Sequence, residues 1–475
     1  MNPSTPFVSG LGAEVISPPK LPLQTMFRLG LFQMALGMMS ILTLGVLNRI
    51  LIDQEFLAVP ATLAGGALAM YQFVSPARVW FGQLSDAKPW LGYHRTTYIR
   101  CGSILFALCA FGAVQVIWRL AATLETVGWG AIAYGWVALL ALMFALYGLC
   151  ISSCSTPFAA LLVDVSDEEN RSKLVGIVWA MLMVGIVLGA VSSGFLLKSL
   201  TPENLESSIN QLFIAIPTCV VGLIFTATAG VEKRYSRYRF RSAIAGREDQ
   251  VTLKTALKVL TASRQTGFFF CFLGVMTLGL FLQQPILEPY AGEVFGMTVA
   301  QSTQLNAFWG IGTLFGITLT GFLIVPRFGK QTTARWGCRV VAGCFILVIL
   351  AGLTRTPSVL QLSMLCLGLG FGLTTNSAVS LMLDLTAAET AGTFIGAWGL
   401  AQALAQASAT VLGGVLLDLG RSLLGQPLLA YGFVFTIEAV LMLLAAVLLQ
   451  RVNVDEFRDK TKTAIATVLA HELDG

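Results

Sequence analysis

The sequence predicts an all-α polytopic membrane protein, with twelve transmembrane helices in two pseudo-symmetric six-helix bundles. First, 56% of the 475 residues are hydrophobic and 12% are charged, with a mean hydropathy of +0.77. Soluble proteins carry about twice that charged fraction. Second, twelve apolar segments are each long enough to cross a bilayer. Third, one segment occurs twice, 220 residues apart, which is typical of transporters built from two homologous halves.

The apolar segments alternate with short polar loops, and about 20 apolar residues suffice to span the hydrocarbon core. We expect spanning helices at residues 28–50, 60–82, 96–118, 131–155, 173–198, 209–230, 267–290, 303–326, 335–353, 358–382, 392–417 and 429–450. The longest polar stretch separates the sixth helix from the seventh. We therefore expect an N-terminal segment 1–27, a bundle 28–230, a basic linker 231–266, a second bundle 267–450 and a tail 451–475.

The basic residues predict the orientation. With the N-terminus placed inside, cytoplasmic segments hold 22 of the 30 Lys and Arg residues, and external loops hold five. Because cytoplasmic loops are enriched in Lys and Arg, we expect both termini in the cytoplasm. These residues lie in short loops between apolar segments, which argues against a nucleic-acid partner. The partner expected throughout is the lipid bilayer, and the basic linker is expected to lie on its anionic leaflet.

The loop after the second helix carries a Gly-x-Leu-x-Asp motif, from Gly82 to Asp86, followed by Gly92 and Arg95. A carboxylate beside helix N-termini and an arginine is stabilised by both, so it can hold two halves together in one state. The alternative is that Asp86 and Arg95 are solvated loop charges. A degraded copy at 321–335 lacks the acid. The motif resembles the loop 2–3 signature of the major facilitator superfamily, which implies a transporter-type fold.

The repeated segment is an acidic loop followed by a long apolar helix rich in small residues. The first copy contains Asp164, Glu169 and Arg171, and the second contains Asp384 and Glu389, with alanine where the first has arginine. We expect these charged turns to clasp and release on the inner side of the membrane. Any Asp–Arg latch in the second half is then one-sided.

Residues 28–39, 47–50 and 91–99, together with both acidic loops, resemble the PucC family, also called the bacteriochlorophyll-delivery family. The resemblance covers roughly residues 26–452. It implies a protein of the thylakoid, intracytoplasmic or inner membrane of a phototrophic bacterium, which assists the assembly of light-harvesting or photosystem complexes. It also implies chlorophyll or bacteriochlorophyll as cargo, without a covalent cofactor. The implied partners are light-harvesting or photosystem apoproteins and pigment-synthesis enzymes.

Ionisable residues inside the membrane are costly and are functional candidates by default. Arg49 ends the first helix as an interface anchor or as part of a gate. Arg78, in the second helix, reaches the interface, or pairs with Asp86 or with an acid of the second repeat. Glu288 lies between two prolines that break the seventh helix, at the mouth of a cavity or in the outer loop. Glu438, inside the twelfth helix, bonds to a neighbouring helix or contacts a ligand.

No predicted span contains a histidine, because the two histidines lie at positions 94 and 471. A bound pigment must therefore take its magnesium ligand from an amide, a carboxylate, a backbone carbonyl or water. Interhelical hydrogen bonds are an equally good account of each buried amide. The amide candidates are Gln33, Asn48, Gln72, Gln283, Gln284, Asn376, Gln402 and Gln406.

The sequence contains no P-loop, nucleophile elbow or metal-ligand cluster, so we expect no enzyme activity and no metal site. The leading hypothesis is an assembly factor that handles chlorophyll-type pigment. The alternative is a proton-coupled secondary transporter of a small or amphipathic solute, with Glu288 and Glu438 as coupling residues. A third hypothesis is a scaffold that binds partners and transports nothing.

Overall fold

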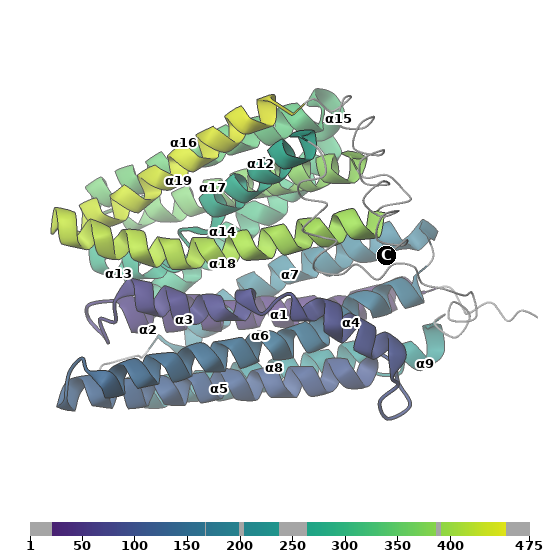
Figure 1. Cartoon of the computed structure of the whole chain (residues 1–475), viewed down its shortest axis with the longest axis horizontal. Coiled ribbons are helices and arrows are strands. Elements are labelled where there is room, and N and C mark those ends of the chain that lie inside the picture. Colours follow the sequence, from purple (N-terminus) through teal and green to yellow (C-terminus); the bar gives the residue numbers. More distant parts are fainter. Residues whose placement is uncertain (1–20, 167, 199–203, 237–263, 386–390, 453–475) are drawn as a thin grey trace, which may run out of the picture.

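The helices of this chain run along one common direction in two groups (Figure 1), as the sequence predicts. The computed structural model describes residues 21–166, 168–198, 204–236, 264–385 and 391–452. Among these residues the structure is helical apart from turns, loops and one isolated β-bridge between Trp90 and Tyr93. The N-terminal group, purple to blue, lies below the C-terminal group, green to yellow, in the view of Figure 1.

The N-terminal bundle begins with one continuous helix whose middle turn widens into a π-helix. Its elements are α1 (Leu23–Ser40), the π-helix (Ile41–Val46), α2 (Leu47–Ile52), α3 (Ala61–Phe73), α4 (Ala77–Ala87), α5 (Thr96–Thr126), α6 (Ala131–Val165), α7 (Glu168–Leu196), α8 (Leu205–Thr228) and α9 (Val231–Tyr235).

The C-terminal bundle contains a second π-helical turn, at Thr320–Ile324, inside its own second spanning helix. Its other elements are α12 (Arg264–Phe281), α13 (Leu287–Phe295), α14 (Val299–Leu319), α15 (Val325–Phe328), α16 (Lys330–Thr354), α17 (Pro357–Leu385), α18 (Ala391–Leu424) and α19 (Pro427–Gln450).

Ten helices in the described part are long and apolar enough to cross a membrane, and the two remaining spans are interrupted. The seventh span breaks at residues 282–286, where the sequence predicts a break beside Pro285. The second span, expected as one helix over 60–82, instead divides into α3 and α4. Pro76 lies at this division and cannot donate the backbone hydrogen bond that would continue α3.

Three helices extend beyond their predicted ends. The helix expected to end at 118 continues to Thr126, and the one expected to end at 155 continues to Val165. The latter contains Pro157, which membrane helices tolerate because neighbouring groups satisfy the freed carbonyl. The helix expected to end at 417 continues to Leu424. The length of the apolar segment therefore underestimates the length of each helix, because the residues beyond that segment are also helical.

The bundles contact each other through two equivalent helix pairs, α3 with α18 and α7 with α14. Gly414 of α18 lies against the backbone of Ala61, and Gly194 of α7 lies against the Gln304 side chain and the Ala300 carbonyl of α14. A side chain at either glycine would collide with the facing helix, so small residues permit this close approach. The two glycines are 220 residues apart and are equivalent in the repeat. The duplicated segments therefore form equivalent contacts between the bundles.

The bundle has two ends that the site description needs. We call the end with loops 53–60 and 296–298 the far end, and the end with loop 88–95 and α9 the linker end. In Figure 1, α2 and α13 mark the far end at the left, and α9 and α15 mark the linker end at the right. If the predicted orientation holds, the linker end is cytoplasmic.

Candidate functional site

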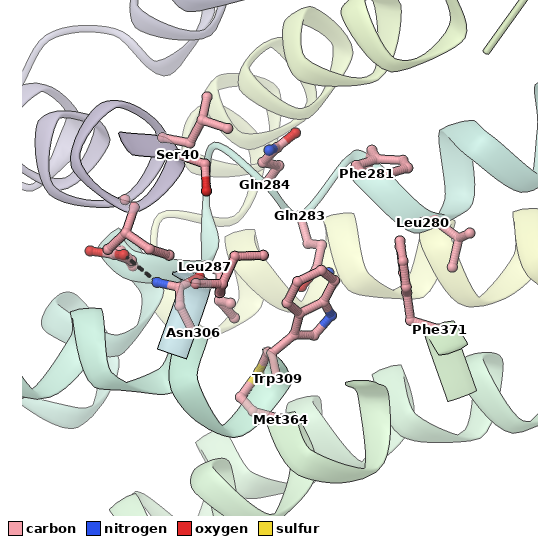
Figure 2. A pocket seen from close by; sticks show the side chains of 15 residues that line it. Ser40, Leu280, Phe281, Gln283, Gln284, Leu287, Asn306, Trp309, Met364 and Phe371 are labelled. Carbon is pink, nitrogen blue, oxygen red and sulfur yellow. Dashed lines mark hydrogen bonds between the residues drawn. The ribbon is translucent and has the colours of Figure 1, made fainter. Parts of the chain in front are cut away.

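A cavity of about 150 Å³ lies between the two bundles (Figure 2). The N-terminal bundle contributes residues of the first helix, from Ser40 to Gly45, and Ile186 of α7. The C-terminal bundle contributes the break between α12 and α13 and faces of α14 and α17. Most of the wall is apolar, with aromatic contacts from Phe371 to Phe281 and to Trp309 at centroid distances of 5.6 and 5.0 Å. The polar groups on the wall are Ser40, Gln283, Gln284, Glu288, Asn306 and the Trp309 indole.

Glu288 is held on the cavity wall by side chains of α14. Its carboxylate accepts a hydrogen bond from the Asn306 amide at 2.7 Å, drawn in Figure 2, and one from the Thr303 hydroxyl at 3.2 Å. The same carboxylate lies against Gly45 of the π-helix in the opposite bundle, where a Cβ would collide with it. Glu288 is 4% exposed. Of the two positions that the sequence allows, the structure places Glu288 on the cavity wall, where this residue touches both bundles.

Glu438 anchors the break in the seventh span. Its Oε1 accepts a hydrogen bond from the backbone N–H of Gln283 at 2.5 Å, which satisfies a donor that the interrupted helix leaves free. The carboxyl is fully buried in α19, and its Oε2 has no hydrogen-bond partner among the described residues. The predicted bond to a neighbouring helix is therefore present. Glu438 does not line the cavity itself.

Arg49 joins the bundles at the far end. Its guanidinium pairs with Asp53 at 3.1 Å and donates to the carbonyls of Met297 and Thr298 in the other bundle, at 2.5 and 3.1 Å. Arg49 is 1% exposed and Asp53 is fully buried. The backbone of Gly292 packs on this ion pair, leaving no room for a side chain. The arginine that the sequence offered as an anchor or a gate lies at a contact between bundles.

A second polar contact closes the same end. The Asp418 carboxylate of α18 accepts the backbone N–H groups of Ala61 and Thr62 at 2.9 and 2.7 Å. These are free donors at the N-terminus of α3, where a negative charge is favoured. Arg421 lies one turn further and pairs with Glu293 of α13 at 2.5 Å. The Arg421–Glu293 pair lies within the C-terminal bundle, whereas the charges of Arg49 and Asp418 join the two bundles at the far end.

Asn48 adds one more bond, from its amide to the Gln284 carbonyl at 3.3 Å. Among the described residues, Asn48, Arg49 and Asp418 each make hydrogen bonds that cross between the bundles. All of them lie in the far half of the molecule.

The linker end holds a different ion pair, inside the N-terminal bundle. Arg95 pairs with Asp164 at 3.0 Å and donates to the Ser85 hydroxyl at 2.5 Å, with Arg95 1% exposed. This pair joins the start of α5 to the end of α6. Gly92, in the same loop, has a φ of 79°, a conformation that favours glycine. Gly82 packs on Thr156 of α6.

Glu232 of α9 caps the same α5 terminus. Its carboxylate accepts the backbone N–H groups of His94, Arg95 and Thr96 at 2.7 to 3.1 Å, and the Thr96 hydroxyl at 2.6 Å. The start of the linker is therefore fixed to the N-terminal bundle. The predicted latch between the bundles stays a prediction, because the side chains of Asp86, Glu169, Arg171 and Asp384, and all of Glu389, lie outside the described residues.

The remaining candidates lie away from the cavity. Gln72 is buried and donates to the Tyr71 hydroxyl at 2.6 Å. Asn376 donates to the Ile317 carbonyl at 3.2 Å, which is the interhelical bond offered as an alternative. Gln33 and Gln402 are half-buried, and Arg78 is exposed. None of these five lines the cavity as described.

The sequence interpretation missed several residues of this arrangement. Asp53 could have been found, because it follows Arg49 by one helical turn, a spacing that allows an ion pair. Asp418 resembles an ordinary loop-proximal charge, and Asn306 and Trp309 resemble ordinary residues of an apolar helix. Gly45 carries no local signal, because its role depends on a carboxylate 243 positions later in the chain.

Comparisons with solved structures identify the fold. A bacterial homologue of the iron transporter ferroportin, in an inward-facing state, aligns with a TM-score of 0.66 at 16% identity, over 91% of this chain and 99% of that chain. A D-xylose-proton symporter aligns with a TM-score of 0.66 at 18% identity, over 92% and 97% of the two chains. The fold is that of the major facilitator superfamily. At such identities the likeness concerns the fold alone.

Sequence comparisons identify the family. The family model described as PUCC protein matches residues 46–457. Protein PucC of Rhodovulum sulfidophilum is 29% identical over 408 residues, which cover 84% of this chain and 86% of that protein. The bacteriochlorophyll synthase 44.5 kDa chain of Rhodobacter capsulatus is 31% identical over 435 residues, covering 89% and 94%. With the ten spanning helices, these matches describe an integral, multi-pass membrane protein of a phototrophic bacterium. The chain belongs to the PucC protein family.

Proposed function

We propose that this protein is a membrane assembly factor that binds a chlorophyll-type pigment and passes it to light-harvesting or photosystem apoproteins. The observation that carries the proposal is the family match over residues 46–457. A relative that aligns over 89% of the chain is named for bacteriochlorophyll synthesis, which supports pigment as the cargo. The role is one of binding and transfer, without a catalytic step. Pigment-synthesis enzymes are the proposed donors.

The cavity between the bundles supports an apolar cargo, because most of its wall consists of aliphatic and aromatic side chains. Its volume of about 150 Å³ is below the range of roughly 300–1,000 Å³ typical of sites for drug-sized ligands. A tetrapyrrole ring therefore requires the bundles to move apart. Because Arg49 and Asp418 hold the far end closed, we propose that the pigment enters from the linker end or laterally from the lipid.

The test is the absorption spectrum of the full-length protein, purified in mild detergent from the membranes of its phototrophic source. We expect pigment bands in an approximately constant ratio to protein through successive purification steps. An unrelated multi-pass protein purified from the same membranes serves as the control for adventitious pigment. Pigment that washes away as it does from the control contradicts the proposal. So does a deletion strain that keeps normal pigment–protein complexes under all growth conditions.

The second candidate is a proton-coupled transporter of a small solute, which the small cavity and its buried Glu288 support. A cavity of about 150 Å³ has room for several water molecules, so a small solute fits without rearrangement. Proteoliposomes would then take up solute under a pH gradient, and Glu288→Gln or Glu438→Gln would abolish the uptake. If both variants lose uptake but still bind pigment, solute transport is a separate activity from the proposed pigment binding.

The cytoplasmic placement of both termini is part of the proposal. Alkaline phosphatase fused after residue 475 is expected to be inactive in cells, because the enzyme requires an oxidising compartment. A fusion within loop 53–60 is expected to be active. The reverse pattern would invert the orientation and the proposed entry side.

A further inference from the structure

The loop between α4 and α5 is a tight hairpin with an apolar tip. The backbone N–H groups of Trp90 and Tyr93 donate to each other's carbonyls, at 2.9 and 3.1 Å. The two residues between them, Leu91 and Gly92, both have a positive φ, of 52° and 79°. The first of these positions usually holds asparagine, aspartate or glycine, because a left-handed backbone crowds a larger side chain. The leucine side chain is also 78% exposed, so neither the turn nor the protein core accounts for it.

The start of α5 holds the hairpin in a fixed position. The Thr97 hydroxyl donates to the Trp90 carbonyl at 2.7 Å, and the Tyr98 hydroxyl donates to the Lys88 carbonyl at 3.0 Å. The rings of Trp90 and Tyr98 pack edge to face, with their centroids 5.5 Å apart. Trp90 nevertheless stays 46% exposed. The fold therefore keeps two large apolar side chains, Trp90 and Leu91, at the surface in a defined geometry.

The tip lies beside the N-terminal bundle. In Figure 1 the loop between α4 and α5 extends sideways at the linker end, away from the C-terminal bundle. Further along α5, Ile104, Leu105 and Leu108 are exposed, as expected for a face that the bilayer covers. A loop at the end of such a face lies at the level of the lipid headgroups, where tryptophan is enriched in membrane proteins. The bilayer that covers α5 therefore also reaches the tip.

Exposed cations accompany the tip. Lys88 lies at the base of the hairpin. Lys233 and Arg234 of α9 follow Glu232, whose carboxylate accepts the backbone N–H of His94 at 2.7 Å, so both lie close to the hairpin. Basic residues beside a membrane surface are attracted to anionic lipids. An apolar tip next to these cations is therefore complementary to a leaflet that contains anionic phospholipid.

We propose that this hairpin is a lipid anchor, in which Trp90 and Leu91 insert into the headgroup layer at the linker end and the neighbouring cations bind anionic phospholipid headgroups. Insertion removes apolar surface from water, which offsets the disfavoured backbone of the leucine. The anchor fixes the N-terminal bundle to the membrane at the linker end, whereas Arg49 and Asp418 join the bundles at the far end. It does not depend on the identity of the cargo.

The test measures the depth of the tip. A nitroxide label is attached at Leu91→Cys in the full-length protein without its nine native cysteines, in nanodiscs of phosphatidylcholine alone or mixed with phosphatidylglycerol. The reference labels are Glu55→Cys, in an exposed far-end loop, and Leu108→Cys, on the lipid-facing side of α5. In the mixed lipid, we expect the ratio of collisions with oxygen to collisions with a water-soluble nickel chelate to lie between the two references. A ratio no higher than that of Glu55→Cys overturns the anchor.

A second comparison tests the cations. Lys88→Gln, Lys233→Gln and Arg234→Gln together should weaken the partition of the tip into the mixed leaflet by about 5-fold for each lost charge, with no change in phosphatidylcholine alone. Lys198→Gln, which removes an exposed lysine at the far end, is the matched control and should keep the lipid dependence of the parent. Thermal unfolding shows that each variant is folded. An unchanged lipid dependence in the triple variant overturns the headgroup contact. A tip that is shielded in native membranes and open to water in nanodiscs contacts another protein, which overturns the lipid anchor.

Discussion

Replacing Arg49 with methionine should open the far end of the protein. The parent guanidinium is 1% exposed, pairs with Asp53 and donates to two carbonyls of the other bundle, at Met297 and Thr298. Methionine fills much of the same space and offers no donor. The variant therefore leaves a buried carboxylate without its cation and two carbonyls without their partner.

The size of the effect follows from these contacts. Removing one partner of a buried ion pair costs about 3–5 kcal/mol. The part that acts between the bundles is the two bonds from the charged guanidinium to Met297 and Thr298. At about 1.5 kcal/mol each, the lower value for a charged donor, their sum is about 3 kcal/mol. The equilibrium between closed and open far ends should then shift by about 100-fold.

The assay measures access to the cavity from the far end. A single cysteine replaces Leu44, which lines the cavity, in a protein whose nine native cysteines have been removed. The rate of labelling by a membrane-impermeant maleimide should rise at least about 10-fold in Arg49→Met. The control is Arg119→Met, which removes an exposed arginine from the part of α5 that lies toward the far end. Arg49→Met combined with Asp53→Leu should recover part of the lost stability, because no buried charge is left unpaired.

An unchanged labelling rate in a folded Arg49→Met protein would refute this reasoning. It would mean that the helix contacts alone hold the far end closed. A double variant as unstable as the sum of its single changes would also contradict it, because the charges would then act independently.

Three further predictions concern packing and capping. Gly414→Val should lower the stability to thermal unfolding by about 1–3 kcal/mol, because α3 leaves no room, whereas Gly222→Val, with open space around it, should not. Arg95→Met should cost about 3–5 kcal/mol, and adding Asp164→Leu should reduce that loss; equal losses would contradict a coupled pair. Glu232→Gln should cost about 0.5–2 kcal/mol and speed amide hydrogen exchange at the start of α5, and unchanged exchange would count against the cap.

The fold class could be predicted because the hydropathy of each segment and the internal repeat are visible in the sequence without knowing which helices pack together. The equivalence of Gly194 and Gly414 in the repeat also carries through to equivalent contacts. The break beside Pro285 follows from the chemistry of proline. Each of these conclusions needs only local information, or a comparison of the chain with itself.

The partners of charged residues could not be predicted in the same way. Arg49 and Glu288 stood out as costly charges inside spans, yet the sequence does not show that their contacts lie in the opposite bundle. The sequence places Arg95 near Asp86 in one loop motif, but it does not show that Arg95 pairs with Asp164, 69 residues away. In the sequence Asp418 resembles a loop charge, and its role becomes visible only when α3 is seen to pack beside it. Such pairings depend on which helices lie side by side, and no local pattern in a single sequence shows this.

The π-helical turn of the first span sets the direction in which Arg49 points. A π-turn contains one more residue than an α-turn, and each residue advances an α-helix by about 100°. If Ile41–Val46 tightened to α-helical hydrogen bonding, everything beyond it would rotate by about that angle relative to α1. The guanidinium would swing away from the Met297 and Thr298 carbonyls while Gly45 turned from Glu288. This single rotation of the helix would therefore break two contacts with the opposite bundle, those of Arg49 and of Gly45, at the same time.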